Sequence, residues 1–446
     1  MALIPTEQYF TLLPVTSSLA RLALTFESHR GLVSHQKPSW IHQRLQIFDA
    51  LSYKNYRWFW LSGATQAMGQ GMQFLVLGWL ALELTNSSYQ LGLVIFIFGL
   101  PNVFFAMLGG IIADRADRLR LLISTRLCVA VLIFALAILR ITDLLEIWHV
   151  YIGVFLLGTI QGLNMPARMA IVPDLVERRH LVNAVALHSM VTQTGQIIGP
   201  ATAGWIIETA GTGAALVVNA GLYFLGLGFL LLIRGLPPRT NTGESAVLEH
   251  FVAGLRFIQS TPILYTLIAM IVAFAFFGAS YRHVLPAFTR DVLNVGAGDT
   301  GLLLLAAGLG ALLGNLILAS LGDFRYKSRL LMASLVLFSV FLTLFAWSPW
   351  FWASWIIALF VGAASFGFFT PLTITLIQLN APSELRGRVL GILQLAPAVH
   401  YLGGLPLAAA ADVSSWPVAI TGGAALSLLV ALWLGVWRPV LRNLKE

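Results

Sequence analysis

Charged side chains are scarce in this chain. Asp, Glu, Lys and Arg together make up 10% of its 446 residues, whereas 58% of the residues are hydrophobic. These four types account for about a quarter of an ordinary soluble domain, so the composition excludes that class. A membrane-spanning helix needs ~20 apolar residues, and the sequence contains about twelve such runs between short polar loops. We therefore predict an all-α membrane protein with twelve transmembrane helices.

Cysteine is almost absent as well. The one cysteine, Cys128, lies in a hydrophobic run, which excludes an internal disulfide and predicts a small buried side chain. No cysteine–histidine spacing typical of a metal site occurs, and neither a nucleotide-binding loop nor a nucleophile–base pair is recognisable. The sequence therefore predicts neither an enzyme nor a protein that holds a metal or another cofactor.

Carboxylates are missing from the middle of the hydrophobic runs and fall at their ends. A carboxyl group that carries protons would be expected near the centre of the bilayer. The deepest titratable side chain is instead His400, between Pro397 and Pro406, and His283 is a second candidate. We expect protons as the coupling ion, but the sequence does not choose between these histidines, a carboxylate at the rim and another ion.

The net charge of +8 is distributed unevenly. If the loop at 109–120 is cytoplasmic, the alternation of loops places all but three of the 27 lysines and arginines on that side, Arg126 and Arg168 included. The three exceptions are Arg140, Arg282 and Arg290. This asymmetry follows the positive-inside rule. It predicts a lipid bilayer rather than nucleic acid as the partner of the basic charge, with both termini in the cytoplasm.

Polar interruptions divide the chain into five parts. Residues 1–50 are too weakly apolar to span a membrane, which predicts a partly disordered cytoplasmic extension. Two six-helix bundles are expected at 51–234 and 262–438, and a polar linker at 235–261 with a short surface helix joins them. A cytoplasmic tail follows at 439–446. The expected spans are 57–82, 88–111, 119–140, 147–170, 181–208, 212–234, 262–288, 299–321, 329–347, 350–378, 387–411 and 416–437.

One charged stretch, residues 109–120, lies between two long apolar runs. Charges are costly inside hydrocarbon, so the stretch predicts a tight turn at the bilayer surface, which could serve orientation alone. It resembles the loop between the second and third helices of major facilitator superfamily transporters, whose pattern is Gly-x-x-x-Asp-Arg-x-Gly-Arg-Arg/Lys. Asp117 replaces the usual glycine and Leu119 a usual basic residue. The matching positions are Gly110, Asp114, Arg115 and Arg118.

The resemblance implies that this loop is a conformational latch. Asp114 would then pair with Arg118, or cap the positive N-terminal end of the eleventh helix beside Arg386. Asp323 occupies the corresponding loop of the second half. The latch candidates are Gly110, Asp114, Arg115, Arg118, Asp323 and Arg386.

The two halves of the sequence form an internal repeat, in which Gly162 and Pro166 correspond to Gly367 and Pro371. Parallel repeats of this kind are typical of this class of transporter. Further stretches resemble the branch of the superfamily that contains the enterobactin exporter and related secretion effectors. The resemblance implies two six-helix pseudo-repeats, a small-molecule substrate and a monomer in the bacterial plasma (inner) membrane. The stretches include Asn55-Tyr56-Arg57, Asn183-Ala184-Val185-Ala186-Leu187 and Leu385-Arg386-Gly387-Arg388-Val389.

The fifth predicted helix carries Gly195, Gly199, Pro200 and Gly204. Their spacing resembles the antiporter motif of exporting members of the superfamily, which implies export rather than uptake. Small residues at this spacing also let two helices pack closely without any bearing on direction. Pro200 interrupts the hydrogen-bond ladder and allows a bend.

The first predicted helix places Gln66, Gln70 and Gln73 on one face. Amides in hydrocarbon need hydrogen-bond partners, so this stripe either lines a substrate cavity or bonds neighbouring helices. Arg282 either reaches the outer interface with a flexible side chain or contacts an anion near the cavity mouth. The substrate-cavity candidates are Gln66, Gln70, Gln73, Asn164, Gln193, Arg282 and Gln394.

Together these features predict a secondary-active exporter of small amphiphilic molecules, siderophore- or drug-like, that works by alternating access and is driven by protons. An uptake permease for a small metabolite is the alternative within the class. A membrane accessory protein that has the fold but transports nothing is the alternative outside it. The substrate itself cannot be inferred from the fold.

Overall fold

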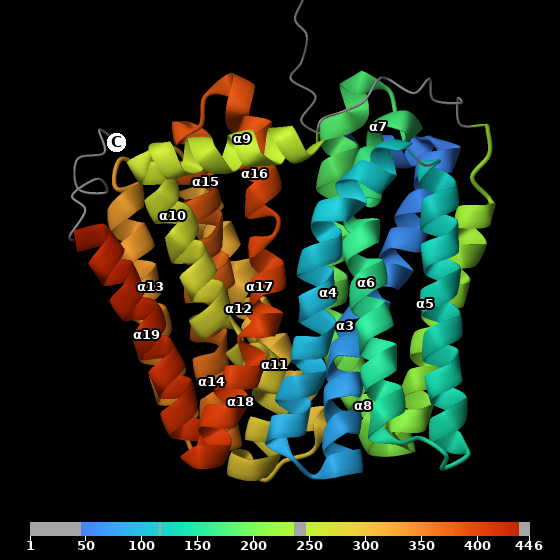
Figure 1. Ribbon diagram of the computed structural model, residues 1–446, viewed down its shortest axis with the longest axis vertical. Helices are drawn as coiled ribbons and strands as arrows, with labels where there is room; N and C mark the ends of the chain where they lie inside the picture. The colour runs from blue at the N-terminus through green and yellow to red at the C-terminus, as the bar shows by residue number, and fades with distance from the viewer. Residues whose placement is uncertain (1–45, 116, 236–246, 437–446) are drawn as a thin grey trace, which may run out of the picture. The chain divides into compact units, whose positions relative to one another are not determined.

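The computed structural model describes residues 46–115, 117–235 and 247–436 (Figure 1). Side chains are described for 48–106, 117–235, 252–396 and 398–435. The chain divides into two units, Met1–Phe48 and Asp49–Glu446, and the features discussed below lie in the second unit, apart from the first residues of one short helix.

The described residues of the second unit are helical apart from their turns. A 3-10 helix, η1 (Gln46–Ser52), precedes the first half. That half comprises α3 (Lys54–Thr85), α4 (Ser88–Arg115), α5 (Arg118–Ile141), α6 (Ile147–Ala170), α7 (Val172–Leu175), η2 (Arg178–His180) and α8 (Leu181–Leu231). The helix α9 (Val247–Ser260) follows, close to the surface helix that the sequence predicts in the linker. It lies across one end of the second half (Figure 1), which we call the α9 end.

The second half contains several helices that are interrupted along their length. Three π-helical turns occur among the described residues, and each continues or joins α-helical segments. The elements are α10 (Pro262–Ala273), η3 (Phe274–Ala279), α11 (Tyr281–Phe288), η4 (Thr289–Leu293), α12 (Ala297–Ser320), α13 (Lys327–Ala346), α14 (Phe351–Gly362), η5 (Ala363–Phe369), α15 (Thr370–Asn380), α16 (Ser383–Leu393), α17 (Ala396–Leu402), α18 (Gly404–Val413) and α19 (Trp416–Val436).

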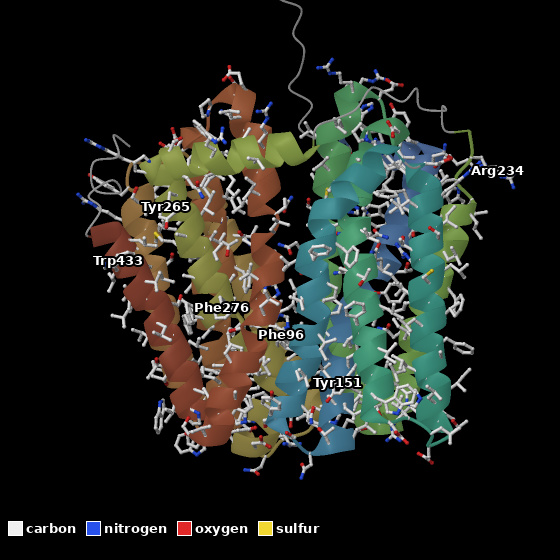
Figure 2. The ribbon with its side chains drawn as sticks, viewed as in Figure 1. Phe96, Tyr151, Arg234, Tyr265, Phe276 and Trp433 are labelled. Atoms are coloured by element: carbon white, nitrogen blue, oxygen red, sulfur yellow. The ribbon has the colours of Figure 1, made fainter. Side chains whose placement is uncertain are left out.

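Ten helical stretches within the described residues are long and apolar enough to cross a membrane. One of them, Arg178–Leu231, has 54 residues, and Gly211 interrupts it with a non-helical φ of 83° and ψ of 170°. Only glycine adopts this backbone conformation readily. Large apolar side chains such as Trp433 project outward from the helices (Figure 2), and Trp433 is 58% exposed. Exposed apolar surface of this extent fits a lipid environment rather than water.

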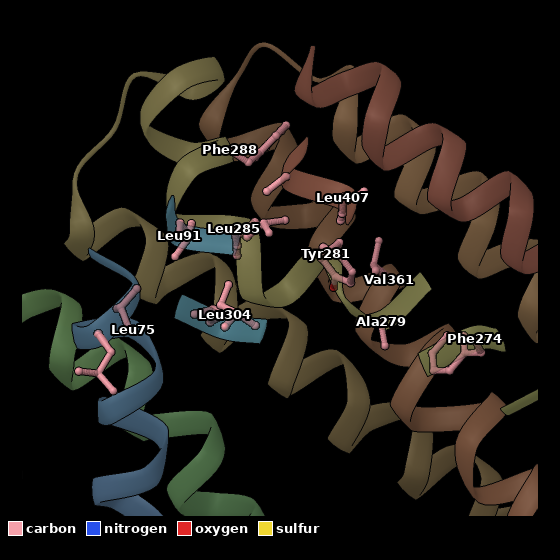
Figure 3. Close-up of a cluster of buried hydrophobic side chains, with 14 of the residues drawn as sticks. Leu75, Leu91, Phe274, Ala279, Tyr281, Leu285, Phe288, Leu304, Val361 and Leu407 are labelled. Carbon is pink, nitrogen blue, oxygen red and sulfur yellow. The ribbon is translucent and has the colours of Figure 1, made fainter. Parts of the chain in front are cut away.

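One hydrophobic cluster extends across both halves (Figure 3). It joins Leu75 of α3 and Leu91 of α4 to Leu285 of α11 and Leu304 of α12, all of which are nearly or fully buried. The cluster continues as far as Ile258 of α9, but these four residues lie toward the end opposite α9, where apolar burial holds the halves together.

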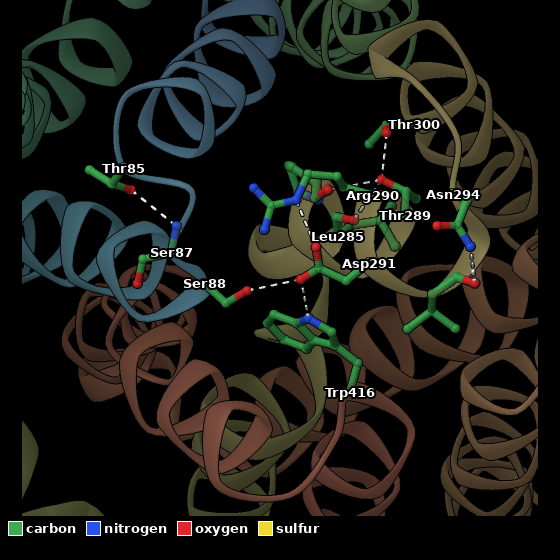
Figure 4. A network of polar contacts seen from close by, with 12 residues as sticks. Thr85, Ser87, Ser88, Leu285, Thr289, Arg290, Asp291, Asn294, Thr300 and Trp416 are labelled. Carbon is green, nitrogen blue, oxygen red and sulfur yellow. Dashed lines mark hydrogen bonds and ion pairs between the residues drawn. The ribbon is translucent and has the colours of Figure 1, made fainter.

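Polar contacts join the halves at the same end (Figure 4). Ser88 Oγ of the first half donates to Asp291 Oδ2 at 3.0 Å, and Trp416 Nε1 donates to the same oxygen at 3.0 Å. Arg290 Nε donates to Asp291 Oδ1 at 2.7 Å. The Gly298 amide donates to Glu208 Oε2 at 2.9 Å. Within the described residues, every hydrogen bond between the halves belongs to this set, which we call the far-end seal.

Cys128 corrects one expectation from the sequence. Its side chain is exposed rather than buried. The hydrophobic run around it forms α5, and Cys128 lies on the outward face of that helix, where apolar side chains such as Leu127 and Val131 are also exposed. A hydrophobic neighbourhood in the sequence therefore marks lipid contact here and not a protein core.

Candidate polar pocket

The helices α3, α5, α6 and α8 enclose a small pocket inside the first half. Polar side chains converge on it from all four helices, and apolar side chains complete its wall. We call it the polar pocket, and its lining residues are Gln66, Gln70, Gln73, Thr125, Arg126, Val129, Leu157, Ile160, Gln161, Asn164 and Tyr223.

The amide stripe of α3 both lines this pocket and bonds its neighbours. Gln70 Nε2 donates to Gln161 Oε1 on α6 at 2.7 Å. The Tyr223 hydroxyl on α8 donates to Gln73 Oε1 at 3.0 Å. Gln66 Oε1 accepts from the guanidinium of Arg126 on α5. Each amide thus links α3 to a different helix and also lines the pocket.

Asn164 joins the same group. Its Nδ2 donates to Thr125 Oγ1 at 2.6 Å, while its Oδ1 is buried without a partner among the described residues. Four of the seven predicted cavity residues, Gln66, Gln70, Gln73 and Asn164, therefore meet in one place. Gln193 and Gln394 are exposed and lie outside the pocket.

Arg282 also lies outside the pocket, and not where the sequence predicted it. Its guanidinium carbon is 5.0 Å from the centroid of the Phe366 ring, an arrangement typical of a cation–π contact. The span that contains it extends to Leu293, beyond the expected end at residue 288, and the π-helical η3 interrupts it. Arg282 is consequently well inside the helix rather than at the interface.

Arg126 lines the polar pocket, although the sequence placed it elsewhere. Its position near a basic loop assigned it to the cytoplasmic surface, but it is 4% exposed and lies about 12 Å along α5 at ~1.5 Å per residue. The signal that could have found it is its context, because apolar residues flank it on both sides within the helix.

A second cluster of polar and aromatic rings lies where the two halves meet. The rings of His283 and His400 stack with centroids 4.5 Å apart and an interplanar angle of 9°. Phe74 of α3 meets His283 edge-on at 4.5 Å, and Tyr401 lies 4.5 Å from the same ring. His400 belongs to the short α17, which is separated from α16 and from α18, and Pro397 and Pro406 lie near the starts of α17 and α18. The two proton-coupling candidates therefore form one ring pair.

The predicted latch falls partly outside the described residues. The backbone of α4 continues through Gly110 and Asp114 to Arg115, but the side chains of residues 107–116 are not among those described. Arg118 bonds Asp174 Oδ2 at 3.1 Å and the carbonyl oxygen of Ala170. It therefore ties the start of α5 to the turn after α6.

The other charged residues of the loops have local partners. Asp117, which stands where the family pattern has glycine, caps α5 by accepting from the amides of Leu119 and Arg120. Asp323 pairs with Lys327 at 2.7 Å, and this hydrogen-bonded ammonium lowers the pKa of the carboxyl group. Arg386 Nη2 donates to the carbonyl oxygen of Ala381 at 3.5 Å.

The glycines of the antiporter-like motif are packing residues in this structure. A Cβ on Gly195 would lie 2.5 Å from the Cβ of Ala67, and one on Gly199 would lie 2.7 Å from the carbonyl oxygen of Met68. These contacts bring α8 onto the backbone of α3. Farther along, Pro200 meets Gly301 and Gly204 meets Ala297, so the same helix also packs against α12 of the second half.

Replacing Gln70 with leucine should change substrate affinity more than folding. The change removes one neutral hydrogen bond, and such a bond contributes about 0.5–1.5 kcal/mol, so we expect apparent KM to change by roughly twofold to tenfold. Flux measurements on Q70L and on Q196L, whose wild-type amide is exposed on α8, provide the comparison. An unchanged KM together with a loss of folded protein would assign Gln70 a structural role only.

Comparison with known proteins identifies the class. The sequence profile of the transmembrane secretion effector family matches residues 46–445, and the chain belongs to this family of the major facilitator superfamily. Its relatives are transporters and not enzymes, as predicted. The multidrug efflux pump Tap of Mycolicibacterium fortuitum is 27% identical over 394 residues, which cover 85% of this chain and 94% of that protein. The enterobactin exporter EntS of Citrobacter koseri is 28% identical over 378 residues, covering 80% and 86%.

Solved structures show the same fold. The nucleoside transporter NupG has a TM-score of 0.67 at 15% identity, covering 88% of this chain and all of that one. A bacterial homolog of the human lysosomal transporter Spinster, in an inward-facing and unoccupied conformation, has a TM-score of 0.64 at 15% identity, covering 87% and 95%. Identities this low relate the folds alone. The family match and the curated relatives show that the protein is an integral membrane transporter.

Proposed function

We propose that this protein is a secondary-active exporter of small amphiphilic molecules, siderophore- or drug-like, that alternates access between two six-helix halves. The observation that carries the proposal is the polar pocket, where amides and a guanidinium meet apolar walls inside a membrane bundle. Such a mixture suits a ligand with both polar and apolar parts. The names of two relatives, a multidrug efflux pump and an enterobactin exporter, support export as the direction.

Twelve spans are consistent with the ten apolar stretches. Gly211 divides the 54-residue stretch into two, and α3 adds one more, which gives twelve. The halves also pack alike: a Cβ on Gly162 would meet Asn102 of α4, and one on its counterpart Gly367 would meet Gly314 of α12. We place the α9 end and both termini in the cytoplasm of a bacterial inner-membrane protein, since the basic loops gather there.

The far-end seal supports an inward-facing state for this structure. Hydrogen bonds between the described residues of the two halves occur only at the end opposite α9. In the proposed cycle these bonds break when the protein opens outward. The loop around Asp114 and Arg118 would act as the latch at the cytoplasmic end, with Arg118 held by Asp174.

Flux in inverted membrane vesicles tests the proposal. Vesicles that contain the protein should accumulate a catecholate siderophore or a fluorescent dye when a proton gradient is imposed, and an ionophore should abolish the accumulation. Gradient-driven movement in the opposite direction would indicate an uptake permease. Absence of flux with every compound, from protein that is folded and inserted, would indicate an accessory protein.

Replacing His400 with glutamine should separate transport from its coupling to protons. Histidine titrates near neutral pH, and the stacked pair with His283 is the candidate carrier. We expect H400Q to retain downhill counterflow while gradient-driven accumulation falls at least tenfold. H149Q, at the start of α6, is the control. Loss of both activities in H400Q, or of neither, would exclude His400 as the carrier.

A further inference from the structure

Arg126 carries an unbalanced charge in the interior of the first half. Its Nη1 donates to the carbonyl oxygen of Ser62 at 3.2 Å, and its Nη2 donates to Gln66 Oε1. Its guanidinium carbon lies 5.8 Å from the centroid of the Tyr223 ring. All three partners are neutral, so they accept hydrogen bonds from the guanidinium or face it without cancelling its charge.

A second arginine shares this interior. Arg168 of α6 and Arg126 line one pocket beside the polar pocket, together with Ser62, Gly63 and Gln66. We call this pocket the basic chamber. The Nε of Arg168 is buried and has no hydrogen-bond partner among the described residues.

His188 of α8 adds a third basic group at the edge of the chamber. A Cβ on Gly63 would lie 3.4 Å from its ring. Both ring nitrogens of His188 are buried, and neither has a partner in the part of the chain that the structure describes. Three basic side chains from three helices therefore converge here, and two of them, Arg168 and His188, have buried nitrogens without a hydrogen-bond partner among the described residues.

Carboxylates do not neutralise these groups. Within residues 48–106, 117–235, 252–396 and 398–435, no ion pair includes Arg126 or Arg168. Arginine does not lose its proton inside proteins, and an isolated buried charge is unfavourable. A bound anion offsets both the charge and the unfilled hydrogen bonds, and the planar guanidinium matches carboxylate, sulfonate and phosphate oxygens.

We propose that the basic chamber binds the acidic group of an organic anion, and that the apolar part of the same molecule lies against Val129, Leu157 and Ile160 in the adjoining polar pocket. This inference rests on the proposed function, since it names the substrate class of the proposed exporter. Arg126 holds the anion and Arg168 adds a second guanidinium. Gln70 and Gln161 offer amides to polar groups between the acidic and apolar parts.

The test compares three probes that share one fluorescent body. Dansylglycine carries a carboxylate, dansylglycinamide is neutral, and dansyl-ethylenediamine is cationic. Binding to the full-length protein in phosphatidylcholine nanodiscs is followed by energy transfer from tryptophan to the dansyl group. Since hydrogen bonds to charged groups are the stronger ones, we expect wild type to bind dansylglycine about tenfold to hundredfold more tightly than the amide.

Matched variants assign the effect to the chamber. R126Q and R168Q should each reduce the preference for the carboxylate at least fivefold, and R126K should retain part of it because the charge remains. R140Q is the control, since Arg140 lies on the same helix but pairs with Glu83 and Asp143 at the far end. If R126Q does not fold, R168Q and R126K still decide the result.

Equal binding of the three probes by wild type, or an undiminished preference in R126Q and R168Q, would overturn the inference. Repeating the titration in phosphatidylglycerol nanodiscs distinguishes a second source of anion: loss of dansylglycine binding there would mean that a lipid headgroup occupies the chamber, which also overturns it. Binding without vesicle flux would support the inference and contradict the exporter. Flux of the amide and the cation without a preference for the carboxylate would support the exporter and contradict the inference.

Discussion

Replacing Gly199 with leucine should abolish transport and strongly reduce the yield of folded protein. A Cβ at this position would lie 2.7 Å from the carbonyl oxygen of Met68 and 2.9 Å from the Cα of Gly71. Both are backbone atoms of α3 and cannot move aside as a flexible side chain would. Overpacking typically costs about 1–3 kcal/mol, and here the larger side chain must separate two helices whose backbones are in contact.

The part of α8 beyond Gly211 supplies the control for this experiment. A Cβ on Gly221 meets nothing within 4 Å, so G221L should fold as wild type does and gain about 0.8 kcal/mol of helix propensity. Thermal unfolding followed by tryptophan fluorescence, size-exclusion chromatography in detergent and vesicle flux would compare the two variants. A G199L protein with wild-type melting temperature and flux would show that α3 and α8 are not held at this distance in the working transporter.

Replacing Asp291 with alanine should shift the protein away from its far-end-closed state. The carboxylate accepts hydrogen bonds from Ser88 of the first half and from Trp416, and it pairs with Arg290. A hydrogen bond to a charged group contributes about 1.5–3 kcal/mol, so loss of the bond to Ser88 alone should change the balance of the two states by about tenfold to hundredfold.

Spin labels at the opposite end would measure this shift. Arg120 and Gly387 are both exposed near the α9 end, and cysteines at these positions can carry labels once Cys128 is replaced by serine. In the proposed cycle, D291A should shorten the distance between the labels as the cytoplasmic end closes. D143N is the control because Asp143 pairs with Arg140 inside the first half. An unchanged distance distribution in D291A would show that the far-end seal does not control the conformational equilibrium.

The helices could be predicted well because hydrocarbon thickness and turn chemistry act locally. The span expected at 147–170 coincides with α6, Ile147–Ala170. Gln66, Gln70 and Gln73 could be placed on one interior face because a helix repeats every 3.6 residues. These inferences needed only the sequence within one helix, together with the rule that amides avoid lipid.

The sequence-based predictions that were wrong concern features that depend on more than one helix. Arg126 belongs to the interior because Gln66, Ser62 and Tyr223 from two other helices surround it. The apolar residues around it in α5 could have placed it inside the span, but they do not say which residues of other helices it meets. Arg282 was misplaced because π-helical η3 and a span that continues to Leu293 change its depth. The exposed face of Cys128 likewise depends on which side of α5 the other helices cover.

The buried charge of Arg126 has an electrical consequence. An elementary charge that crosses the whole membrane potential changes in energy by ~2.3 kcal/mol per 100 mV. A guanidinium that crosses a fraction of the potential changes in energy by the same fraction of this value. Arg126 and Arg168 are permanently positive, so reorientation of the empty first half displaces positive charge, whereas an anion bound between them reduces the charge displaced. Voltage is therefore expected to act more strongly on the return of the empty carrier than on the step that moves the substrate.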